Sequence, residues 1–295
     1  RHIEPTPAGN TMTDTGKSIR ARLLNIAKKE NLSFQLLIIR YLHERLLFRV
    51  SLSRYAGNFC LKGGALMYVY TLEQTRPTMD IDFLGTNIPN EISVIVSAFN
   101  EICSIDYQPD AVIFDTGNIL AEEITGQDKY PGIRMHIYAK LDTISQRIQV
   151  DVGFGDIVIP APVQLSYPTL LPDSGIPVIQ AYSLETVVAE KFEAMIDLST
   201  ANSRMKDFYD VYQILTTREL NPNHLANAIH ETFRNRNTTY TSNHALFSPA
   251  FPNDPNRLRQ WKSFLNRNHL DQDLDFSVVI EVIVNSLSPI WERIR

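Results

Sequence analysis

The most constraining feature of the chain is a pair of aspartates set two positions apart in a short apolar stretch. Asp80 and Asp82 alternate with apolar residues between Met79 and Leu84. This period of two predicts a β-strand, because successive side chains of a strand point to opposite faces of its sheet. Both carboxylates therefore lie on one face, where they repel each other unless a cation sits between them. A solvated edge strand with alternating charges is the alternative interpretation.

The first half of the chain is expected to hold most of the sheet. Apolar residues recur at helical spacing between residues 18 and 53, which predicts two amphipathic helices. A short apolar run, 59–61, ends at Gly63-Gly64, and helix-forming residues follow it to residue 72. Further patterns predict one helix at 91–102 and three strands at 119–124, 133–141 and 147–154.

Five prolines between Pro160 and Pro177 mark a change in the chain. They predict a loop that crosses between two structural halves, because proline disrupts helices and central strands. Helical patterns dominate afterwards. Ser183 is expected to cap a helix whose first turn contains Glu185, and further helical patterns include 204–215 and 276–287. We therefore expect an α+β fold with a flexible leader (1–17), a sheet domain (18–160), a proline-rich connection (161–182) and a helical domain (183–295).

The net charge excludes capture of nucleic acid by a general basic field. Lys and Arg number 28 against 33 Asp and Glu, which gives −5 at pH 7. With 44% hydrophobic residues, the chain can bury a core. Cys60 and Cys103 lack metal-ligand spacing and are expected as buried thiols of a reducing compartment. No apolar stretch has the length to cross a bilayer and no secretory pattern opens the chain, so we expect a cytoplasmic protein without a membrane partner.

Lys62-Gly63-Gly64 stands where a predicted strand meets the following helix. Glycine lets a ligand approach the backbone closely, and a helix N-terminus supplies amide donors for an anion. The turn is therefore a candidate phosphate cradle. A Gly-Gly turn also serves chain geometry alone, and for this motif by itself that interpretation stays open.

A third acid lies on another predicted strand. Asp151 is flanked by valines, so its side chain opposes a buried face. Three carboxylates from neighbouring strands predict a two-metal site with Asp80, Asp82 and Asp151 as ligands. Mg²⁺ suits them, because it accepts one or two carboxylates and takes its other ligands from water and substrate phosphates, and Mn²⁺ is the alternative ion. The nearby Asp156 leaves open that one of the two later acids only stabilises a turn.

Other motifs accompany the glycine turn and the acidic pair in a specific order. They are Arg22-Leu23-Leu24, Arg45-Leu46-Leu47-Phe48-Arg49, Arg76-Pro77-Thr78, Asp151-Val152-Gly153-Phe154-Gly155-Asp156, Ala189-Glu190-Lys191-Phe192 and Arg204-Met205-Lys206-Asp207-Phe208-Tyr209-Asp210. Across most of its length the chain thus resembles the AbiEii/AbiGii nucleotidyltransferase toxins, relatives of the MenT toxins in the polymerase-beta-like nucleotidyltransferase superfamily. The wider superfamily usually has Gly-Ser at the phosphate turn, whereas Gly64 supplies no hydroxyl here.

The resemblance implies a polymerase-beta-like sheet domain and a set of site residues. The acids Asp80, Asp82 and Asp151 would bind the metal, Gly63 and Gly64 would receive the triphosphate, and Lys191 would neutralise phosphate charge. Asp210 matches an acid that supports activity in these toxins, and it would orient Lys191 or the acceptor. Further nucleotide-binding candidates are Lys62, Arg76 and Asp207.

A plainer interpretation of several candidates stays open. The spacing of one set of candidates is that of exposed ion pairs along a helix: Arg204, Lys206, Asp207 and Asp210. Each such surface pair stabilises a helix by about a few tenths of a kcal/mol. Lys62 and Arg76 are likewise divided between phosphate contact and structural ion pairing. His43, His136 and His230 lie among apolar residues and are expected as packing or hydrogen-bonding positions, and no Ser or Cys nucleophile motif occurs.

The acceptor is the least determined part of the prediction. Between Arg218 and His269, seven basic residues stand against three acidic ones, with aromatic residues interleaved. This stretch either grips a nucleic acid or forms an ordinary helical subdomain with an aromatic core. The resemblance implies the 3′ end of tRNA as acceptor, a block of translation, a cognate antitoxin and a role in phage defence. Nucleotidylation or phosphorylation of a protein, and a catalytically silent binding protein, are the competing hypotheses.

Overall fold

The computed structural model describes residues 12–71, 76–124 and 132–294. Its first half contains the helices α1 (Met12–Glu30), α2 (Phe34–Leu52), α3 (Gly63–Tyr70) and α4 (Ile92–Cys103). Because α1 begins at Met12, the predicted flexible leader is wrong for residues 12–17, and its remainder, 1–11, lies outside the described residues. This segment lacks proline and carries Asp14 in the first helical turn, where the helix dipole favours an acid.

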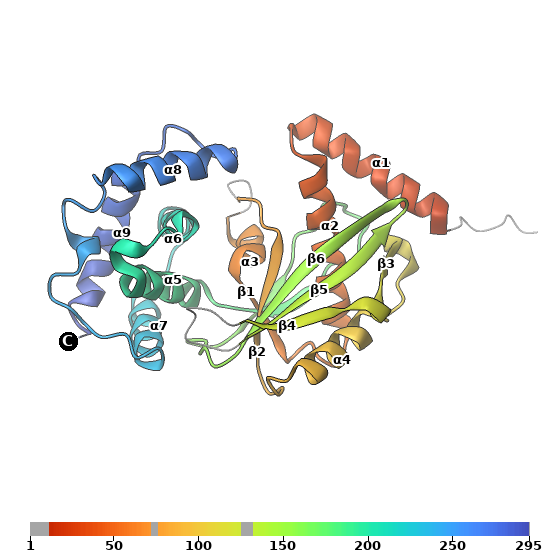
Figure 1. Cartoon of the computed structure of the whole chain (residues 1–295), viewed down its shortest axis with the longest axis horizontal. Coiled ribbons are helices and arrows are strands. Elements are labelled where there is room, and N and C mark those ends of the chain that lie inside the picture. Colours follow the sequence, from red (N-terminus) through yellow and green to blue (C-terminus); the bar gives the residue numbers. More distant parts are fainter. Residues whose placement is uncertain (1–11, 72–75, 125–131, 295) are drawn as a thin grey trace, which may run out of the picture.

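In the described part of the chain, eight strands form one mixed sheet, whose arrangement can be followed in Figure 1. They are β1 (Phe59–Lys62), β2 (Asp80–Gly85), β3 (Val112–Phe114), β4 (Leu120–Ile124), β5 (Gly132–Leu141), β6 (Ile144–Gly153), β7 (Val163–Ser166) and β8 (Val178–Ala181). Their order is β3-β5-β6-β2-β1-β8-β7, and β4 also pairs with β5. The acidic strand β2 lies in the centre, antiparallel to β1 and parallel to β6. The edge-strand interpretation of Asp80 and Asp82 is therefore wrong.

The expected crossing loop at 161–182 instead adds two strands to this sheet. β7 and β8 pair with each other, and β8 continues the sheet in parallel with β1. All five prolines lie outside both strands and so do not interrupt their hydrogen bonds. Each strand has only four residues, which is too short for an alternating pattern to stand out.

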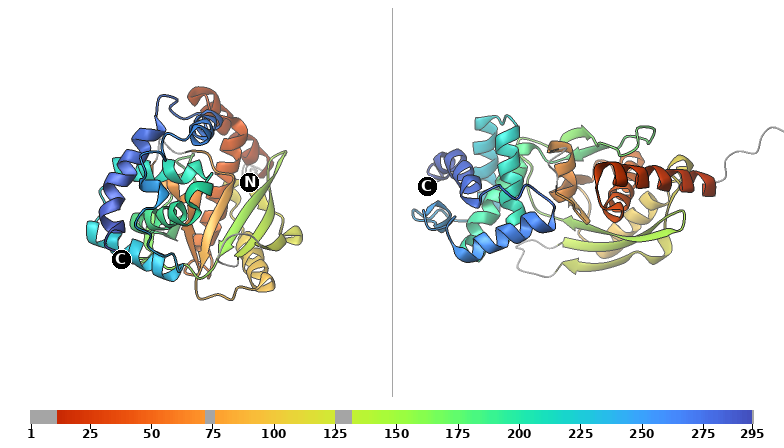
Figure 2. Two further views of the ribbon diagram at one scale, coloured as in Figure 1. Left: turned by 60° about the vertical axis from the view of Figure 1, so that its left-hand side comes forward. Right: turned by 90° about the horizontal axis from the view of Figure 1, so that it is seen from above.

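Helices α2 and α4 pack on one face of the sheet, while no helix of the described residues covers the opposite face of β4, β5 and β6, which is called the open face (Figures 1 and 2). Along β5 the alternation is clear, because Ile133, Met135 and Ile137 are buried whereas Tyr138 and Lys140 are exposed.

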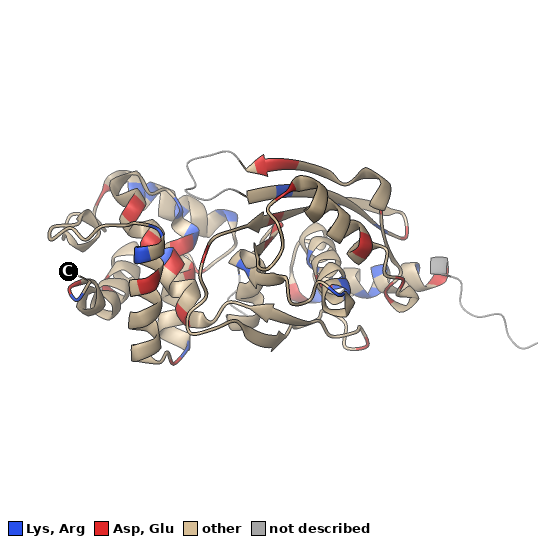
Figure 3. Ribbon diagram, turned by 90° about the horizontal axis from the view of Figure 1, so that it is seen from below, with Lys and Arg blue, Asp and Glu red and all other residues tan. Residues whose placement is uncertain are grey.

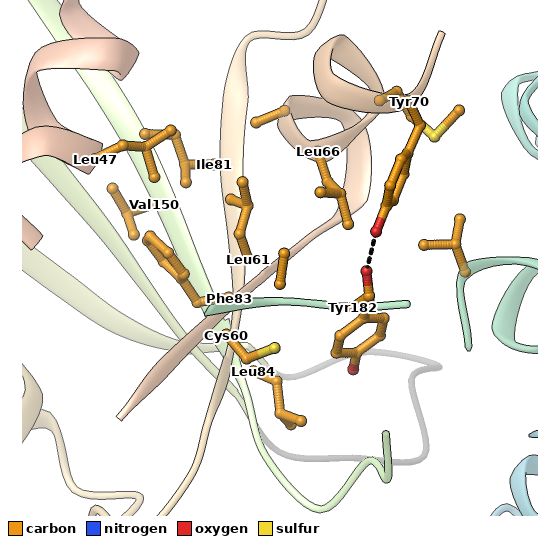
Figure 4. Close-up of a cluster of buried hydrophobic side chains, with 14 of the residues drawn as sticks. Leu47, Cys60, Leu61, Leu66, Tyr70, Ile81, Phe83, Leu84, Val150 and Tyr182 are labelled. Carbon is orange, nitrogen blue, oxygen red and sulfur yellow. Dashed lines mark hydrogen bonds between the residues drawn. The ribbon is translucent and has the colours of Figure 1, made fainter. Parts of the chain in front are cut away.

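Buried apolar side chains of β1, β2, β6 and the helices meet in the core of the sheet half (Figure 4). Leu61, Phe83 and Val150 are among them, and each such side chain stabilises the fold by roughly 1.5–3 kcal/mol. Tyr70 Oη donates a hydrogen bond to the Tyr182 carbonyl, which joins α3 to the segment after β8. In the motif at 45–49, Arg49 pairs with Asp110 at 2.7 Å, and both side chains are buried, so this motif serves the fold.

The second half of the chain is helical. It comprises α5 (Leu184–Leu198), α6 (Met205–Thr217), α7 (Pro222–Asn235), α8 (Pro255–Arg267) and α9 (Phe276–Trp291). Ser183 caps α5 by accepting a hydrogen bond from the Thr186 amide, as predicted. In Figure 2, right, α8 lies on the same side of the molecule as the open face of the sheet. No helix in the described ranges is both long enough and apolar enough to cross a bilayer.

Candidate active site

A single row of charged residues crosses five strands of the sheet. Lys62 on β1 lies opposite Asp82 on β2, and Asp82 lies opposite Asp151 on β6. The row continues to Arg134 on β5 and then to Glu122 on β4. Residues directly opposite each other in paired strands share one face of the sheet. Strand register therefore brings together acids that lie far apart in the sequence.

Asp80, Asp82 and Asp151 form a triad that can hold a divalent cation. One carboxylate oxygen of each lies within 4.8 Å of the others. Burial, and then repulsion by Asp80 and Asp151, raises the pKa of Asp82 to about 6. Three hard oxygen donors, one of which resists ionisation without a counter-charge, fit Mg²⁺ or Mn²⁺. The three acids converge as expected, and their role as metal ligands stays a prediction.

Neighbouring side chains hold two of these acids in place. Thr78 Oγ1 donates a hydrogen bond of 2.7 Å to Asp80. Arg134 donates two hydrogen bonds, of 2.7 and 2.9 Å, to Asp151. The sequence did not single out either residue. Thr78 lies inside a motif that was noted, but the position of Arg134 opposite Asp151 depends on strand register, which no local pattern reveals.

Gly63 and Gly64, the glycine turn of the sequence, are the first two residues of α3 and follow β1 directly, beside Asp82. Gly63 has a φ of 64°, a left-handed conformation that glycine adopts without strain. A Cβ atom on Gly63 would meet the Asp82 carboxylate, and one on Gly64 would lie 2.5 Å from Thr78 Oγ1. No side chain caps α3, so the amides at its N-terminus can serve an anion. The predicted phosphate cradle thus adjoins the triad.

Lys62 belongs to an ion-pair network that connects the sheet with the helical half. Its Nζ lies 2.8 Å from Asp156 and 3.1 Å from Glu190 of α5. Arg236 contacts the same two carboxylates at 2.8 and 3.0 Å. Figure 3 shows acidic and basic residues interleaved along the helices of this half. Lys62 therefore forms structural ion pairs, and Asp156 is a member of the same network. A role of Lys62 in nucleotide binding stays a prediction.

Arg76, Lys191, Asp207 and Asp210 form a buried charge cluster next to the glycine turn. Arg76 binds Asp210 through hydrogen bonds of 2.9 and 3.0 Å. Lys191 Nζ lies 2.7 Å from Asp207 and 2.9 Å from Asp210. Burial disfavours the charge of Lys191, but Asp207 and Asp210 outweigh it and raise its pKa.

These contacts decide whether the acids of the motif at 204–210 form exposed ion pairs or belong to a buried cluster. Asp207 and Asp210 are only 0% and 1% exposed, so the interpretation of the motif as exposed ion pairs is wrong for both. The contact between Asp210 and Lys191 fits the expected orienting role of Asp210. The nucleotide-binding roles of Arg76, Lys191 and Asp207 stay predictions.

A cavity of about 530 Å³ lies between α6 and α8. Four basic residues line it, together with Phe264 and uncharged polar groups, and none of the lining residues is acidic: Arg76, Arg204, Lys206 and Arg267. Arg76 connects the cavity with the glycine turn, because its guanidinium lies 3.4 Å from the position that a Cβ of Gly64 would occupy. Lys206 is close enough to Asp82 to lower the pKa of that carboxyl, against the larger effect of burial. Positive charge therefore gathers beside the triad.

The aromatic residues between 218 and 269 are mostly buried in the helical half. Phe233, Phe251 and Trp261 are 1–3% exposed, and Phe247 stacks on Trp291 of α9. These buried rings cannot stack on bases. For these residues, the interpretation of the stretch as an ordinary helical subdomain with an aromatic core is confirmed.

The histidines and cysteines take no part in the triad. His43 is buried, and burial lowers its pKa to about 4. Cys60 and Cys103 are free and buried as expected, and burial raises both thiol pKa values to about 12. Among the described residues, the triad contains carboxylates alone.

Fold and site together define a class of protein: a mixed-sheet chain in which converging acids and a glycine turn can place a divalent cation beside a triphosphate. A family model for the nucleotidyl transferase AbiEii toxin of type IV toxin–antitoxin systems matches residues 45–282. The chain therefore belongs to the AbiEii nucleotidyltransferase toxin family.

Other comparisons give more distant likenesses. JHP933 from Helicobacter pylori is 14% identical, with 89% of this chain and 94% of that chain covered and a TM-score of 0.49. A second H. pylori chain, described as a nucleotidyltransferase, is 16% identical, with 89% and 97% covered and a TM-score of 0.49. A segment of 73 residues is 30% identical to serum paraoxonase/arylesterase 2 of Bos taurus and covers 24% of this chain and 21% of that relative's length.

Proposed function

We propose that this chain transfers a nucleotide from a nucleoside triphosphate to the 3′ hydroxyl of tRNA in a magnesium-dependent reaction and thereby blocks translation. The convergence of Asp80, Asp82 and Asp151 beside the Gly63-Gly64 turn carries the proposal. Membership of the AbiEii family supports nucleotide transfer. In this role the chain is the toxin of a toxin–antitoxin pair, acts in the cytoplasm in phage defence, and has a cognate antitoxin as its partner.

The residues around the triad divide the work of binding. The three carboxylates would hold Mg²⁺, which would lower the pKa of the attacking hydroxyl and offset the charge of the triphosphate. The hydroxyl oxygen would bond to the α-phosphorus while the bond to the leaving pyrophosphate breaks. The amides at the start of α3 receive phosphate oxygens. Thr78 keeps Asp80 oriented, and Arg134 offsets the charge of Asp151.

Lys206 and Arg267 supply positive charge for the triphosphate in addition to Lys191. Lys191 is committed to two buried carboxylates, at 2.7 and 2.9 Å. Lys206 and Arg267 line the cavity beside the triad, and neither forms an ion pair with another described residue. Their ammonium and guanidinium groups can therefore contact phosphates without first breaking an internal pair. This assigns the cavity between α6 and α8 to the nucleotide.

The test incubates purified protein with bulk tRNA, Mg²⁺ and each labelled nucleoside triphosphate in turn. We expect a labelled band that survives protease and disappears with ribonuclease. Asp80→Ala and Asp82→Ala should abolish the label, whereas Asp273→Ala, at an exposed acid that does not line the cavity, should keep it. A band that protease removes identifies a protein acceptor, and absence of label in every lane contradicts nucleotide transfer to tRNA.

A further inference from the structure

We propose that the open face of the sheet binds the acceptor, and that it does so by holding the single-stranded end of a nucleic acid. The open face consists of the side chains of β3 to β6 that point away from α2 and α4, and by strand register it starts at Asp151 and Arg134. Figure 1 shows the strands that carry it. This inference rests on the proposed function, because the chain needs an acceptor surface only if the triad transfers nucleotides.

Strand register arranges the open face in successive rows that lead away from the triad. Next to the row of Asp151 and Arg134 come Leu120, His136 and Gln149, then Tyr138 and Arg147, and finally Ile113, Lys140 and Ser145. At about 3.3 Å per residue, β6 spans about 20 Å between Asp151 and Ser145. A strand that advances about 3.4 Å per nucleotide can place several nucleotides over that length.

Beyond the row of Glu122, Arg134 and Asp151, the open face combines positive charge with one exposed ring and apolar groups. Lys140 and Arg147 are exposed, and neither forms an ion pair with a described residue. Tyr138 is 39% exposed, and Leu120 and Ile113 are 58% and 54% exposed. Cations that contact phosphates beside rings that stack on bases are typical of single-strand recognition. The charge and chemistry of the open face therefore complement a single-stranded nucleic acid.

The open face and the basic cavity lie on different sides of the triad. Asp82 has β1 and the glycine turn on one side and Asp151 of β6 on the other. The cavity adjoins the glycine turn through Arg76, whereas the open face begins at Asp151. This arrangement suits a transfer reaction, because the acceptor hydroxyl must approach the phosphorus roughly in line with the leaving group and opposite to it. The buried aromatic residues of the helical half offer no comparable surface for bases.

The experiment measures fluorescence anisotropy of a labelled single-stranded RNA of about 10 nucleotides, without nucleoside triphosphate. The wild-type protein should bind it with an affinity that falls with salt. Lys140→Glu/Arg147→Glu should weaken binding about tenfold or more, and should reduce the slope of log affinity against log salt by about 1.4, or about 0.7 for each lost contact. Tyr138→Ala should weaken binding about fivefold or more through the loss of a stacked base, whereas Tyr138→Phe should keep the affinity.

The matched control is Lys28→Glu/Arg293→Glu, which changes the net charge equally at exposed positions outside the open face. This control should keep the wild-type affinity, and its slope of log affinity against log salt should stay close to that of the wild type. The neutral pair Lys140→Gln/Arg147→Gln repeats the test with a smaller change, and thermal melting followed by circular dichroism verifies that each variant is folded. Equal losses in the control, unchanged affinity in the open-face variants, or no RNA binding by the wild type would overturn the proposal. RNA binding by the wild type without label transfer would instead contradict the proposed function and leave the open face as an RNA-binding surface.

Discussion

Asp82 lies between two other carboxylates, and its protonation couples the candidate metal site to the stability of the fold. Its folded pKa of about 6 exceeds the ordinary value of 3.8, chiefly because of burial. The folded state therefore keeps this proton to a higher pH than the unfolded chain does. The stability that the group contributes is complete below about pH 4 and is lost as the pH rises through about 6.

Asp82→Asn should remove this loss of stability. In a chelator near pH 7, we expect the variant to be more stable than the wild type by at most about 3 kcal/mol, from a difference of about 2 pKa units at 1.36 kcal/mol each. Urea unfolding near pH 4 and near pH 7 measures the difference. Mg²⁺ should then stabilise the wild type far more than the variant. A variant that is less stable than the wild type at neutral pH would contradict the electrostatic account.

Lys191 is the cation on which Asp207 chiefly depends. Lys191→Met leaves this buried carboxylate with the half-exposed Arg204 as its remaining ion-pair partner among the described residues, and we expect a loss of about 3–5 kcal/mol in the free energy of unfolding. Lys191→Met/Asp207→Asn should recover part of the loss, because the unpaired charge is gone. Lys262→Met, at an exposed position of α8, serves as the control and should change stability by less than about 0.5 kcal/mol. Similar losses in both single variants would refute the importance of the buried pair.

At the scale of elements, the junction of β1 and α3 leaves room for no side chain at Gly63. We expect Gly63→Ala to cost about 1–2 kcal/mol for its left-handed backbone and, by displacing the Asp82 carboxylate, to weaken Mn²⁺ binding measured by electron paramagnetic resonance. Gly57→Ala is the matched control, since a Cβ there meets nothing within 4 Å and should leave Mn²⁺ binding unchanged. Normal Mn²⁺ affinity in Gly63→Ala would show that Asp82 is not a ligand.

The length of each element decided how well the sequence predicted it. β5 and β6 have ten residues each, so their alternation of buried and exposed positions was recognisable, although β6 begins three residues earlier than expected. The sequence predicted a loop in place of β7 and β8, because each strand has only four residues and lies beside prolines. The convergence of Asp80 and Asp82 followed from a local period of two. No local pattern could predict the positions of Arg134 and Arg236, because strand register and helix packing bring these two partners to the site from distant segments.

At the scale of the whole molecule, a buried charge network joins the sheet half to the helical half. Arg236, just after α7, contacts Asp156 near the end of β6, and Glu190 and Glu193 of α5. Because these groups are largely shielded from solvent, the network stabilises the relative position of triad and cavity more than surface pairs could.

Arg236→Met should therefore destabilise the protein by about 3–5 kcal/mol, because Asp156 and Glu190 then keep Lys62 as their shared cation while Glu193 loses its ion pair with Arg236. Calorimetry should show a lower melting temperature, with the helical half unfolding apart from the sheet. Arg234→Met, two residues earlier, removes a 72% exposed guanidinium that pairs with Glu231 and should change stability by less than about 0.5 kcal/mol. A single cooperative transition at the wild-type temperature in Arg236→Met would refute the coupling.

The row of charges across five strands also bears on when the chain can act during its own synthesis. Asp151 meets Asp82 only after β6 has been made and has paired in parallel with β2. A nascent polypeptide that ends before β6 carries two of the three acids, and a sheet that pairs one residue out of step turns Asp151 toward the helix-covered side. A ribosome that translates this chain is thus not exposed to a complete candidate metal site until the sheet has emerged through β6 and aligned.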